Sequence, residues 1–159
     1  MSAVRPAPLA FDDFYRENYR SMVFLARATT QSVGMAEEIV QDAFVQLYQR
    51  WDQVGEPRAW LRRAVLSLCT SWVRRTVRAR SVPMIALDES RHDLDASLDI
   101  WCALSRLPPR QRAAVVLRYV EDLSERDIAH ALGCRMGTVK STLSRARQTL
   151  RSELTDDRD

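Results

Sequence analysis

Apolar residues recur every three or four positions through the first half of the chain, which is the period of an amphipathic helix. The pattern predicts helices over residues 11–30, 35–51 and 58–80. The second of these has the clearest apolar stripe, formed by Ile39, Val40, Ala43, Phe44, Leu47 and Trp51. Gly55 breaks the pattern after it, and Pro57 suits the first turn of the third helix.

The second half repeats the helical period in four shorter stretches, predicted over residues 98–106, 109–120, 124–132 and 138–154. Between the halves, at residues 81–98, the period lapses, Pro83 disfavours helix and acidic side chains outnumber basic ones. No stretch shows the bounded alternation of a strand. We therefore predict an all-α protein of two small helical domains, residues 11–80 and 99–154, joined by a flexible linker.

The 159 residues carry 24 Lys and Arg against 21 Asp and Glu, a net charge of +3, and 46% of them are hydrophobic. This composition is typical of a folded protein and excludes extended disorder. No apolar stretch is long enough to span a membrane, and the first ten residues have no apolar signal core, so we expect a cytoplasmic protein. The cysteines Cys69, Cys102 and Cys134 stand far apart. We interpret them as buried thiols and expect neither a metal site nor a cofactor.

The predicted helix over residues 58–80 is strongly basic, with seven arginines and no acid. One of its faces repeats, at spacings of four, three, four and four, Arg63, Ser67, Thr70, Arg74 and Arg78. A row of guanidinium groups matches the phosphates of a nucleic acid. A solvated helix face is the alternative, although such faces usually mix both signs of charge. Trp60 and Trp72 are interpreted as core residues, with stacking of one of them on an unpaired base as the alternative.

Residues 123–147 have the layout of a helix-turn-helix motif. Ser124 and Thr138 are expected as the N-caps of its two helices, and Gly133 permits the positive φ that a helix end favours. Apolar residues predict the buried faces, which comprise Leu123, Ile128, Ala129 and Leu132 on the first helix and Val139, Leu143, Ala146 and Leu150 on the second.

The outward face of the second helix then carries Lys140, Ser141, Ser144, Arg145 and Gln148. Side chains of these types read base edges in the major groove. Arg147 and Arg151 are better placed for phosphates. A helical hairpin that contacts only protein is the alternative.

Four stretches together resemble the extracytoplasmic-function (ECF) sigma factors, which are initiation subunits of bacterial RNA polymerase. Residues 137–147, GTVKSTLSRAR, closely resemble the signature of the family's fourth region, and residues 107–119, LPPRQRAAVVLRY, resemble its opening. Residues 36–51, AEEIVQDAFVQLYQRW, look like the second-region helix that docks on the polymerase clamp. Residues 57–61, PRAWL, with the arginine-rich helix after them, look like the part that opens and reads the minus-10 element.

The resemblance implies a role for each of three surfaces. The clamp helices of the polymerase would be contacted by Glu37, Glu38, Asp42 and Gln46. The minus-35 duplex would be read by Lys140, Ser141, Ser144 and Arg145, with Arg147 and Gln148 beside them. The melted minus-10 strand would be held by the loop before the basic helix and by Arg63, Ser67, Arg74, Arg75 and Arg78. The chain departs from the family pattern at three positions: Ser67 stands where Asn is common, Ser71 where an acid is common and Thr142 where Arg is usual.

We therefore predict a promoter-specificity factor that works with core RNA polymerase and promoter DNA and has no enzymatic activity. Members of the family are commonly held inactive by an anti-sigma factor, and the sequence leaves open whether this chain has such a partner. A free-standing helix-turn-helix repressor or activator is the alternative, but it would need neither the acidic helix nor the separate basic one. An enzyme is disfavoured because no nucleophile and base pair, metal-ligand spacing or glycine-rich phosphate loop occurs.

Overall fold

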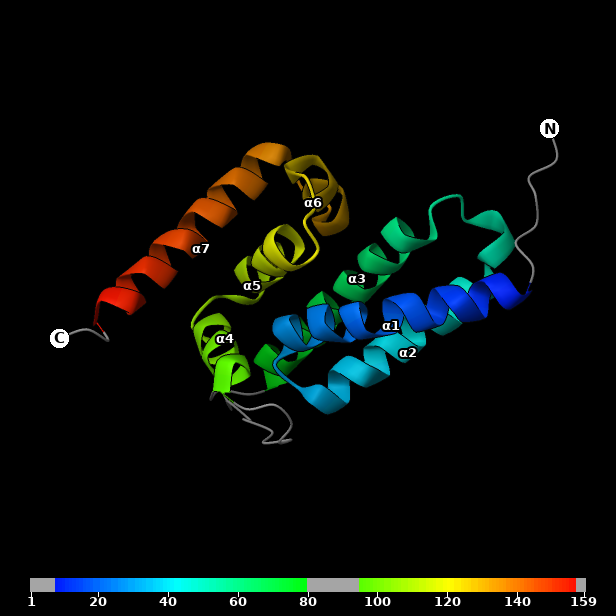
Figure 1. The fold of residues 1–159 in the computed structure, drawn as a ribbon, viewed down its shortest axis with the longest axis horizontal. Coiled ribbons are helices and arrows are strands. Elements are labelled where there is room, and N and C mark those ends of the chain that lie inside the picture. The colour runs from blue at the N-terminus through cyan, green and yellow to red at the C-terminus, as the bar shows by residue number, and fades with distance from the viewer. Residues whose placement is uncertain (1–7, 80–94, 157–159) are drawn as a thin grey trace.

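Seven α-helices make up most of the described part of the chain, residues 8–79 and 95–156, in the computed structural model (Figure 1). In chain order they are α1 (Pro8–Thr30), α2 (Val33–Gln49), α3 (Pro57–Ala79), α4 (Asp95–Ser105), α5 (Pro109–Val115), α6 (Glu125–Leu132) and α7 (Met136–Asp156). A 3-10 turn, η1 (Trp51–Gln53), follows α2, and a π-helical turn, η2 (Val116–Val120), follows α5. These two ranges contain no strand, so the prediction of an all-α protein is confirmed.

The observed helix starts lie within three residues of the predicted ones, and two of the differences concern a predicted feature. Helix α4 begins at Asp95, inside the predicted linker at 81–98, whose residues 81–94 lie outside the described part. Helix α7 begins at Met136, because the carbonyl of Arg135 already accepts a helical hydrogen bond from the Val139 N–H at 3.1 Å. Thr138 is therefore inside the helix, and its prediction as the N-cap was wrong.

The predicted helix over residues 109–120 changes its hydrogen-bond pattern halfway. Helix α5 ends at Val115, and η2 is wider because the Glu121 N–H donates to the carbonyl of Val116, five residues back, at 3.1 Å. Turns of the π-helical kind are rare in proteins, and those that occur are often found at functional sites. Here the turn places the side chain of Glu121 against Arg62 of α3.

Helices α1, α2 and α3 enclose one apolar core, centred on Phe44 of α2. Its ring contacts Phe14 and Tyr15 of α1, with centroids 6.3 and 4.6 Å apart. Ser32 caps α2 by accepting a hydrogen bond from the Met35 N–H at 3.2 Å. The buried members are Met22, Ala26, Ala36, Ile39, Val40, Ala43, Phe44, Leu47, Leu61, Val65 and Cys69. Five of the six residues predicted for the apolar stripe of α2 are thus confirmed as buried, whereas Trp51 lies in η1 and is only partly buried against this core. Trp60 and Trp72 also pack against this core.

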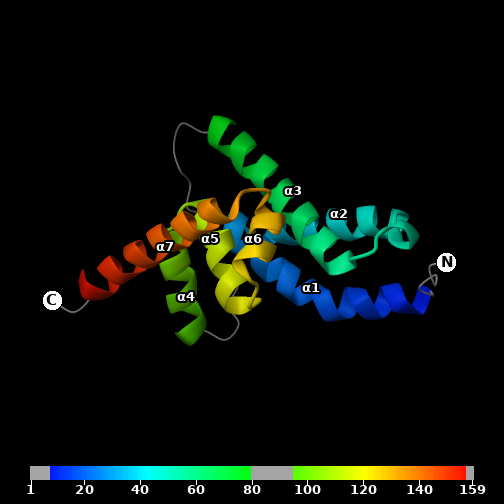
Figure 2. The same cartoon turned by 90° about the horizontal axis from the view of Figure 1, so that it is seen from above.

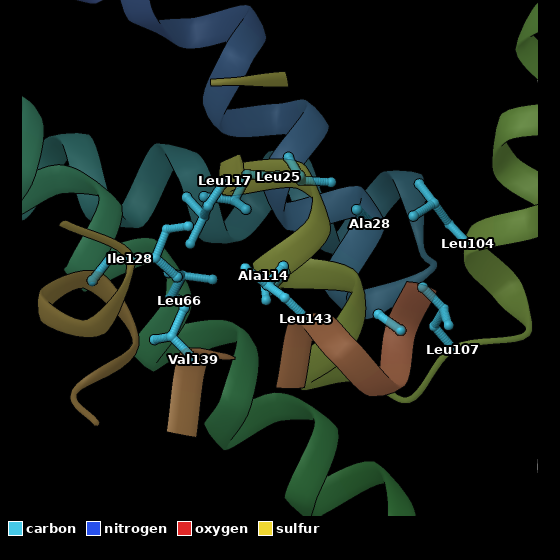
Figure 3. Packing of buried hydrophobic residues seen from close by; sticks show 14 of the residues in the cluster. Leu25, Ala28, Leu66, Leu104, Leu107, Ala114, Leu117, Ile128, Val139 and Leu143 are labelled. Carbon is cyan, nitrogen blue, oxygen red and sulfur yellow. The ribbon is translucent and has the colours of Figure 1, made fainter. Parts of the chain in front are cut away.

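A second core joins the two halves of the chain. Leu25 and Ala28 of α1 and Leu66 of α3 belong to one buried cluster with Leu117 and Ile128 of the second half (Figure 3). Helices α5 and α6 accordingly lie between α7 and the pair α1 and α3 in both views (Figures 1 and 2). Because one core extends across both halves, the division into domains at 11–80 and 99–154 stays a prediction.

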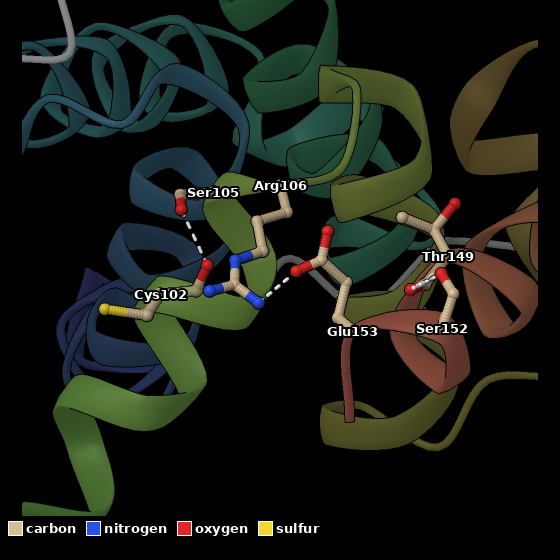
Figure 4. A network of polar contacts seen from close by, with 6 residues as sticks. All are labelled: Cys102, Ser105, Arg106, Thr149, Ser152 and Glu153. Carbon is tan, nitrogen blue, oxygen red and sulfur yellow. Dashed lines mark hydrogen bonds and ion pairs between the residues drawn. The ribbon is translucent and has the colours of Figure 1, made fainter. Parts of the chain in front are cut away.

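The end of α4 is tied to the end of α7 by a polar contact. The guanidinium of Arg106 donates to the carboxylate of Glu153, 47 residues later (Figure 4). Both side chains are more than a third exposed, so the pair orients the last turns of α7 and contributes little to stability.

Candidate polymerase and nucleic-acid interfaces

The helix-turn-helix forms as the sequence indicates. The Ser124 side chain caps α6 by accepting a hydrogen bond from the Asp127 N–H at 3.1 Å. Gly133 ends α6 with φ 64°, in the left-handed region that glycine adopts without strain. Ile128 of α6 and Val139 of α7 are fully buried between the two helices and the rest of the second core. These contacts fix the position of the start of α7 relative to α6.

All six side chains predicted to read or hold the minus-35 duplex are exposed on α7: Lys140, Ser141, Ser144, Arg145, Arg147 and Gln148. Two of them already have partners. Lys140 Nζ lies 3.9 Å from a Glu125 carboxylate oxygen, and the Arg147 Nε–H donates to the Tyr119 hydroxyl at 2.7 Å. Both contacts are at the surface, so exchanging them for a phosphate or base costs little. The exposed Tyr119 thereby positions Arg147, a role that the sequence did not indicate.

Thr142 occupies the position where the family usually has arginine, and its side chain is buried at 9% exposure. It lies on the core side of α7 with Val139, Leu143 and Ala146. The departure from the family pattern therefore removes a cation from the inner edge of the helix and leaves its outward face intact.

The arginines of α3 divide into an exposed group and one buried member. The predicted strand-binding residues Arg63, Ser67, Arg74, Arg75 and Arg78 are exposed, as is Thr70. Arg62 is buried at 9% exposure and forms an ion pair with Glu121. Of the six arginines of α3, five are therefore exposed to a ligand, and Arg80 of the predicted helix lies outside the described residues.

Part of this basic face forms a cleft with the second half of the chain. The cleft has a volume of about 610 Å³. Its α3 wall is formed by Arg63, Leu66, Ser67, Thr70, Ser71, Val73 and Arg74, and its opposite wall by Pro108, Pro109, Arg110, Ala113, Ala131, Leu132 and Gly133. Three arginines line it and no acidic side chain does, so the cleft attracts anions.

A second cavity, of about 460 Å³, lies at the loop before α3, to which the family resemblance assigns part of the melted minus-10 strand. Trp60 and Arg63 of α3 line it together with Arg50, Gln53 and other residues of the loop. Trp60 thus contacts both the first core and this cavity. His130 of α6 reaches the same cavity from the second half of the chain.

The acidic face of α2 has an apolar component that the sequence analysis missed. Glu37, Glu38, Asp42 and Gln46 are all exposed. Val45 and Tyr48 beside them are 54% and 63% exposed. Val45 lies three residues after Asp42 and seven after Glu38, so it shares their face. Val45 and Tyr48 lie off the buried stripe of α2, and this position in the sequence is the signal that identifies them as surface residues.

The cysteines are not equivalent. Cys69 is fully buried, and this burial raises the pKa of its thiol to about 12. Cys102 is exposed, so its interpretation as a buried thiol was wrong. It lies on the outward side of the short helix α4, away from Leu104. Among the described residues no group of three or more His, Cys, Asp or Glu could hold a metal ion, and no described helix is long and apolar enough to cross a membrane.

Comparison with known proteins accounts for both halves of the chain. The sequence model described as Sigma-70 region 2 matches residues 14–79, and that of Sigma-70, region 4 matches residues 97–150. An RNA polymerase sigma-E factor of Streptomyces avermitilis is 35% identical over 153 residues, which cover 92% of this chain and 86% of that protein. The ECF RNA polymerase sigma factor SigM of Mycobacterium tuberculosis is 32% identical over 149 residues, covering 89% and 75%. The chain belongs to the ECF family of RNA polymerase sigma factors.

Solved structures of sigma factors share the fold. The sigma factor RpoE in complex with the anti-sigma factor NepR from Bartonella quintana matches with a TM-score of 0.68 and 27% identity, over 91% of this chain and 98% of that one. CnrH in complex with the cytosolic domain of CnrY matches in fold with a TM-score of 0.69. As an ECF sigma factor the chain serves promoter-directed transcription initiation, with core RNA polymerase and promoter DNA as its partners. The family assignment favours this function over the free-standing repressor or activator.

Proposed function

We propose that three helices of this sigma factor divide the work of initiation. Helix α2 docks on the polymerase clamp, α7 reads the minus-35 duplex, and α3 with the loop before it holds the melted minus-10 strand. One observation carries the proposal: the three surfaces are exposed on three separate helices, and each has the chemistry that its partner requires.

The α7 surface suits duplex DNA because its exposed polar side chains start in the first turns of a helix whose opposite face is buried. Arg145 and Lys140 can donate to guanine edges, and Gln148 can pair with adenine. Ser141 and Ser144 are short enough to let the helix enter the groove. Arg147, held by Tyr119, is placed to contact the phosphates at the edge of the groove.

The α3 surface suits a single strand. Arg63, Arg74, Arg75 and Arg78 supply cations along the strand's backbone, and Ser67 supplies a hydroxyl between them. The cavity at the loop before α3 offers the ring of Trp60 and the guanidinium of Arg63 to a base that has left the stack. Strand opening is then driven by binding energy alone, and no catalytic group is needed.

The α2 surface suits a basic protein partner. Glu37, Glu38 and Asp42 present three carboxylates, and Val45 and Tyr48 add apolar area that can be buried on docking. Charge complementarity would speed association and fix its register, while Tyr48 has the character of an interface anchor. We extend the proposal to an anti-sigma factor as a further partner, because the solved relative RpoE is in complex with the anti-sigma factor NepR.

The test is reconstitution of holoenzyme from the purified chain and core polymerase. The double variant Arg74→Ala with Arg78→Ala is expected to bind core polymerase normally but to leave the minus-10 region closed, which permanganate reactivity of unpaired thymines measures. The matched control is Arg16→Ala with Arg20→Ala, which removes two exposed arginines from α1. Unchanged permanganate reactivity in the α3 variant would remove α3 from the proposed role.

Docking is tested separately by charge reversal. Asp42→Lys is expected to weaken binding to core polymerase, whereas Glu17→Lys, at an exposed position of α1, makes the same change in net charge and is expected to have little effect. Equal loss in both variants would show a general charge effect rather than a docking surface.

A further inference from the structure

The cleft between α3 and the second half of the chain holds three arginines whose charge no acidic side chain in the cleft offsets. Arg63 and Arg74 line it from α3, and Arg110 lines it from α5. Within residues 8–79 and 95–156, none of these guanidinium groups forms an ion pair or a side-chain hydrogen bond. Like charges around one cleft repel each other, so an anion bound between them relieves this repulsion and gains contacts of its own.

The two arginines of α3 lie on one face of the helix with hydroxyl groups between them. They are eleven residues apart, which is close to three turns and about 16 Å along the helix axis. Ser67, Thr70 and Ser71 line the cleft between them. The Thr70 hydroxyl donates to the carbonyl of Leu66 at 2.8 Å, whereas the side chains of Ser67 and Ser71 bond to no other described residue. Two hydroxyl donors are therefore available along the same face as the cations.

The cleft also has an apolar surface. Leu66 and Val73 contribute to it from α3, and Pro108, Ala113 and Leu132 contribute from the opposite wall. Leu66 and Ala113 are members of the second core, at 4% and 1% exposure, so packing fixes this part of the surface. Sites for small molecules combine apolar walls with a few convergent polar groups in volumes of roughly 300–1,000 Å³. The cleft, at about 610 Å³, has both properties.

We propose that this cleft is a binding site for a nucleoside polyphosphate, with the phosphates on the arginines and the base on the apolar surface. A chain of phosphates supplies several negative charges, and a guanidinium group can donate two parallel hydrogen bonds to one phosphate. The hydroxyls of Ser67 and Ser71 can donate to the remaining phosphate oxygens. The base supplies the flat apolar group that the walls can cover.

The cleft overlaps the proposed strand-binding surface only in part. Arg63, Ser67 and Arg74 belong to both, whereas Arg75 and Arg78 do not line the cleft. Arg110 lines the cleft and has no place on the strand-binding surface. A bound nucleotide therefore withdraws two arginines and a hydroxyl from the melted strand, a consequence that rests on the proposed role of α3.

The first experiment uses the full chain without polymerase, so it does not depend on the proposed function. Isothermal titration calorimetry with adenosine triphosphate and guanosine triphosphate should give saturable binding at one site per chain for at least one of them. Adenosine lacks the phosphates and inorganic triphosphate lacks the base, so each should bind at least about tenfold more weakly. The proposal is wrong if neither nucleotide binds, or if inorganic triphosphate binds as tightly as the nucleotides.

Substitutions then locate the site. Arg74→Ala and Arg110→Ala should each raise the nucleotide Kd about three- to tenfold, because each removes one charge-assisted contact at a partly exposed position. Arg75→Ala is the matched control, since it removes an exposed arginine of α3 that does not line the cleft. Circular dichroism checks that the variants are folded. Equal losses in Arg75→Ala and Arg110→Ala would indicate attraction by the net charge and would overturn the assignment to the cleft.

A single strand of DNA is the other occupant to be tested. A short single-stranded oligonucleotide is titrated into the same four proteins, wild type and the three variants. Its binding should depend on Arg74 and Arg75 but not on Arg110. If the oligonucleotide binds through Arg110 and neither nucleotide binds, the cleft is part of the strand's path and the proposal is overturned.

The second experiment separates the nucleotide site from the proposed function. Open complexes are formed with core polymerase without added nucleotide, and permanganate reactivity is measured. Arg110→Ala should leave this reactivity unchanged, whereas Arg75→Ala should lower it, which is the reverse of their effects on the nucleotide Kd. Nucleotide binding that needs Arg110, with full reactivity in every variant, would support the site and count against the role of α3. Reactivity lost in Arg75→Ala without any nucleotide binding would support the role of α3 and overturn the site.

Discussion

Arg145 is the best candidate for reading a base, because it is exposed on α7 and its backbone lies where the helix is fixed by the buried Leu143 and Ala146. Arg145→Ala should weaken discrimination at particular minus-35 base pairs by about 1–3 kcal/mol. Competition between promoters that differ at single base pairs measures this. Arg147→Ala should instead weaken all sequences alike, because Arg147 is placed for a phosphate. If Arg145→Ala weakened binding to all promoter sequences equally, Arg145 would be a phosphate contact as well.

Cys69 should make stability depend on pH above neutrality. Its folded pKa of about 12 is higher than the ordinary thiol value of 9.0, so the unfolded chain releases this proton first as pH rises. The stabilisation is therefore complete below pH 9 and is lost above it, by up to about 1.4 kcal/mol per pH unit. Urea unfolding of wild type and Cys69→Ala at pH 8 to 10 tests this, since only the wild type contains the thiol. The same dependence of the free energy of unfolding on pH in the two proteins would contradict this prediction.

Single residues were predictable where their role is local. Ser124 as a cap and Gly133 with positive φ follow from the chain on either side of them, and both are confirmed. Arg112 and Arg62 were not identified, because an arginine in an amphipathic sequence is normally exposed. Their burial depends on acceptors that lie far away in the chain, the carbonyls of α1 for Arg112 and the carboxylate of Glu121 for Arg62.

The turn between α6 and α7 determines where the recognition helix points. Gly133→Ala should destabilise the protein by about 1–2 kcal/mol, because a β-carbon disfavours the left-handed region, although the space around it is open. Gly137→Ala is the control: it lies within α7, its β-carbon also meets nothing within 4 Å, and it should be neutral or stabilising. Thermal unfolding measures both. Similar losses in both variants would show that the αL conformation is not the cause.

The helices could be predicted from the sequence over the residues that their apolar stripes cover. The helices of the first half were found because each buries a face of three- and four-residue period. The start of α7 and the π-helical turn after α5 were missed because hydrogen-bond geometry sets them, and neither changes the apolar period. The exposed Val45 and Tyr48 on α2 were missed because they lie beside the buried stripe, and the apolar period does not account for them.

The docking of the two halves could not be derived from the sequence. Leu25, Ala28 and Leu66 lie on α1 and α3, which already contribute apolar residues to the first core. The helical period of the sequence does not show that helices of the second half pack against these three residues. The net charge of +3 was equally uninformative, because basic side chains gather on α3 and acidic ones on α2. For this molecule, the packing of α5 and α6 on α1 and α3 is a property of the whole chain.

The ion pair between the halves provides a solution test of that arrangement. Arg62→Met should be strongly destabilising, by about 3–5 kcal/mol, because it leaves the carboxylate of Glu121 buried without its partner. Glu121→Met should cost less, since Arg62 is the more exposed member and can reach water. The double variant should regain most of the loss, because two methionines can pack where the ion pair was.

Urea unfolding of the four proteins gives the coupling energy of the pair, expected at about 1–3 kcal/mol. The two side chains meet only if α3 and η2 are docked, so the coupling reports whether the two halves of the chain pack together in free solution. Additive effects of the two single substitutions would mean that the halves are separated in the free chain.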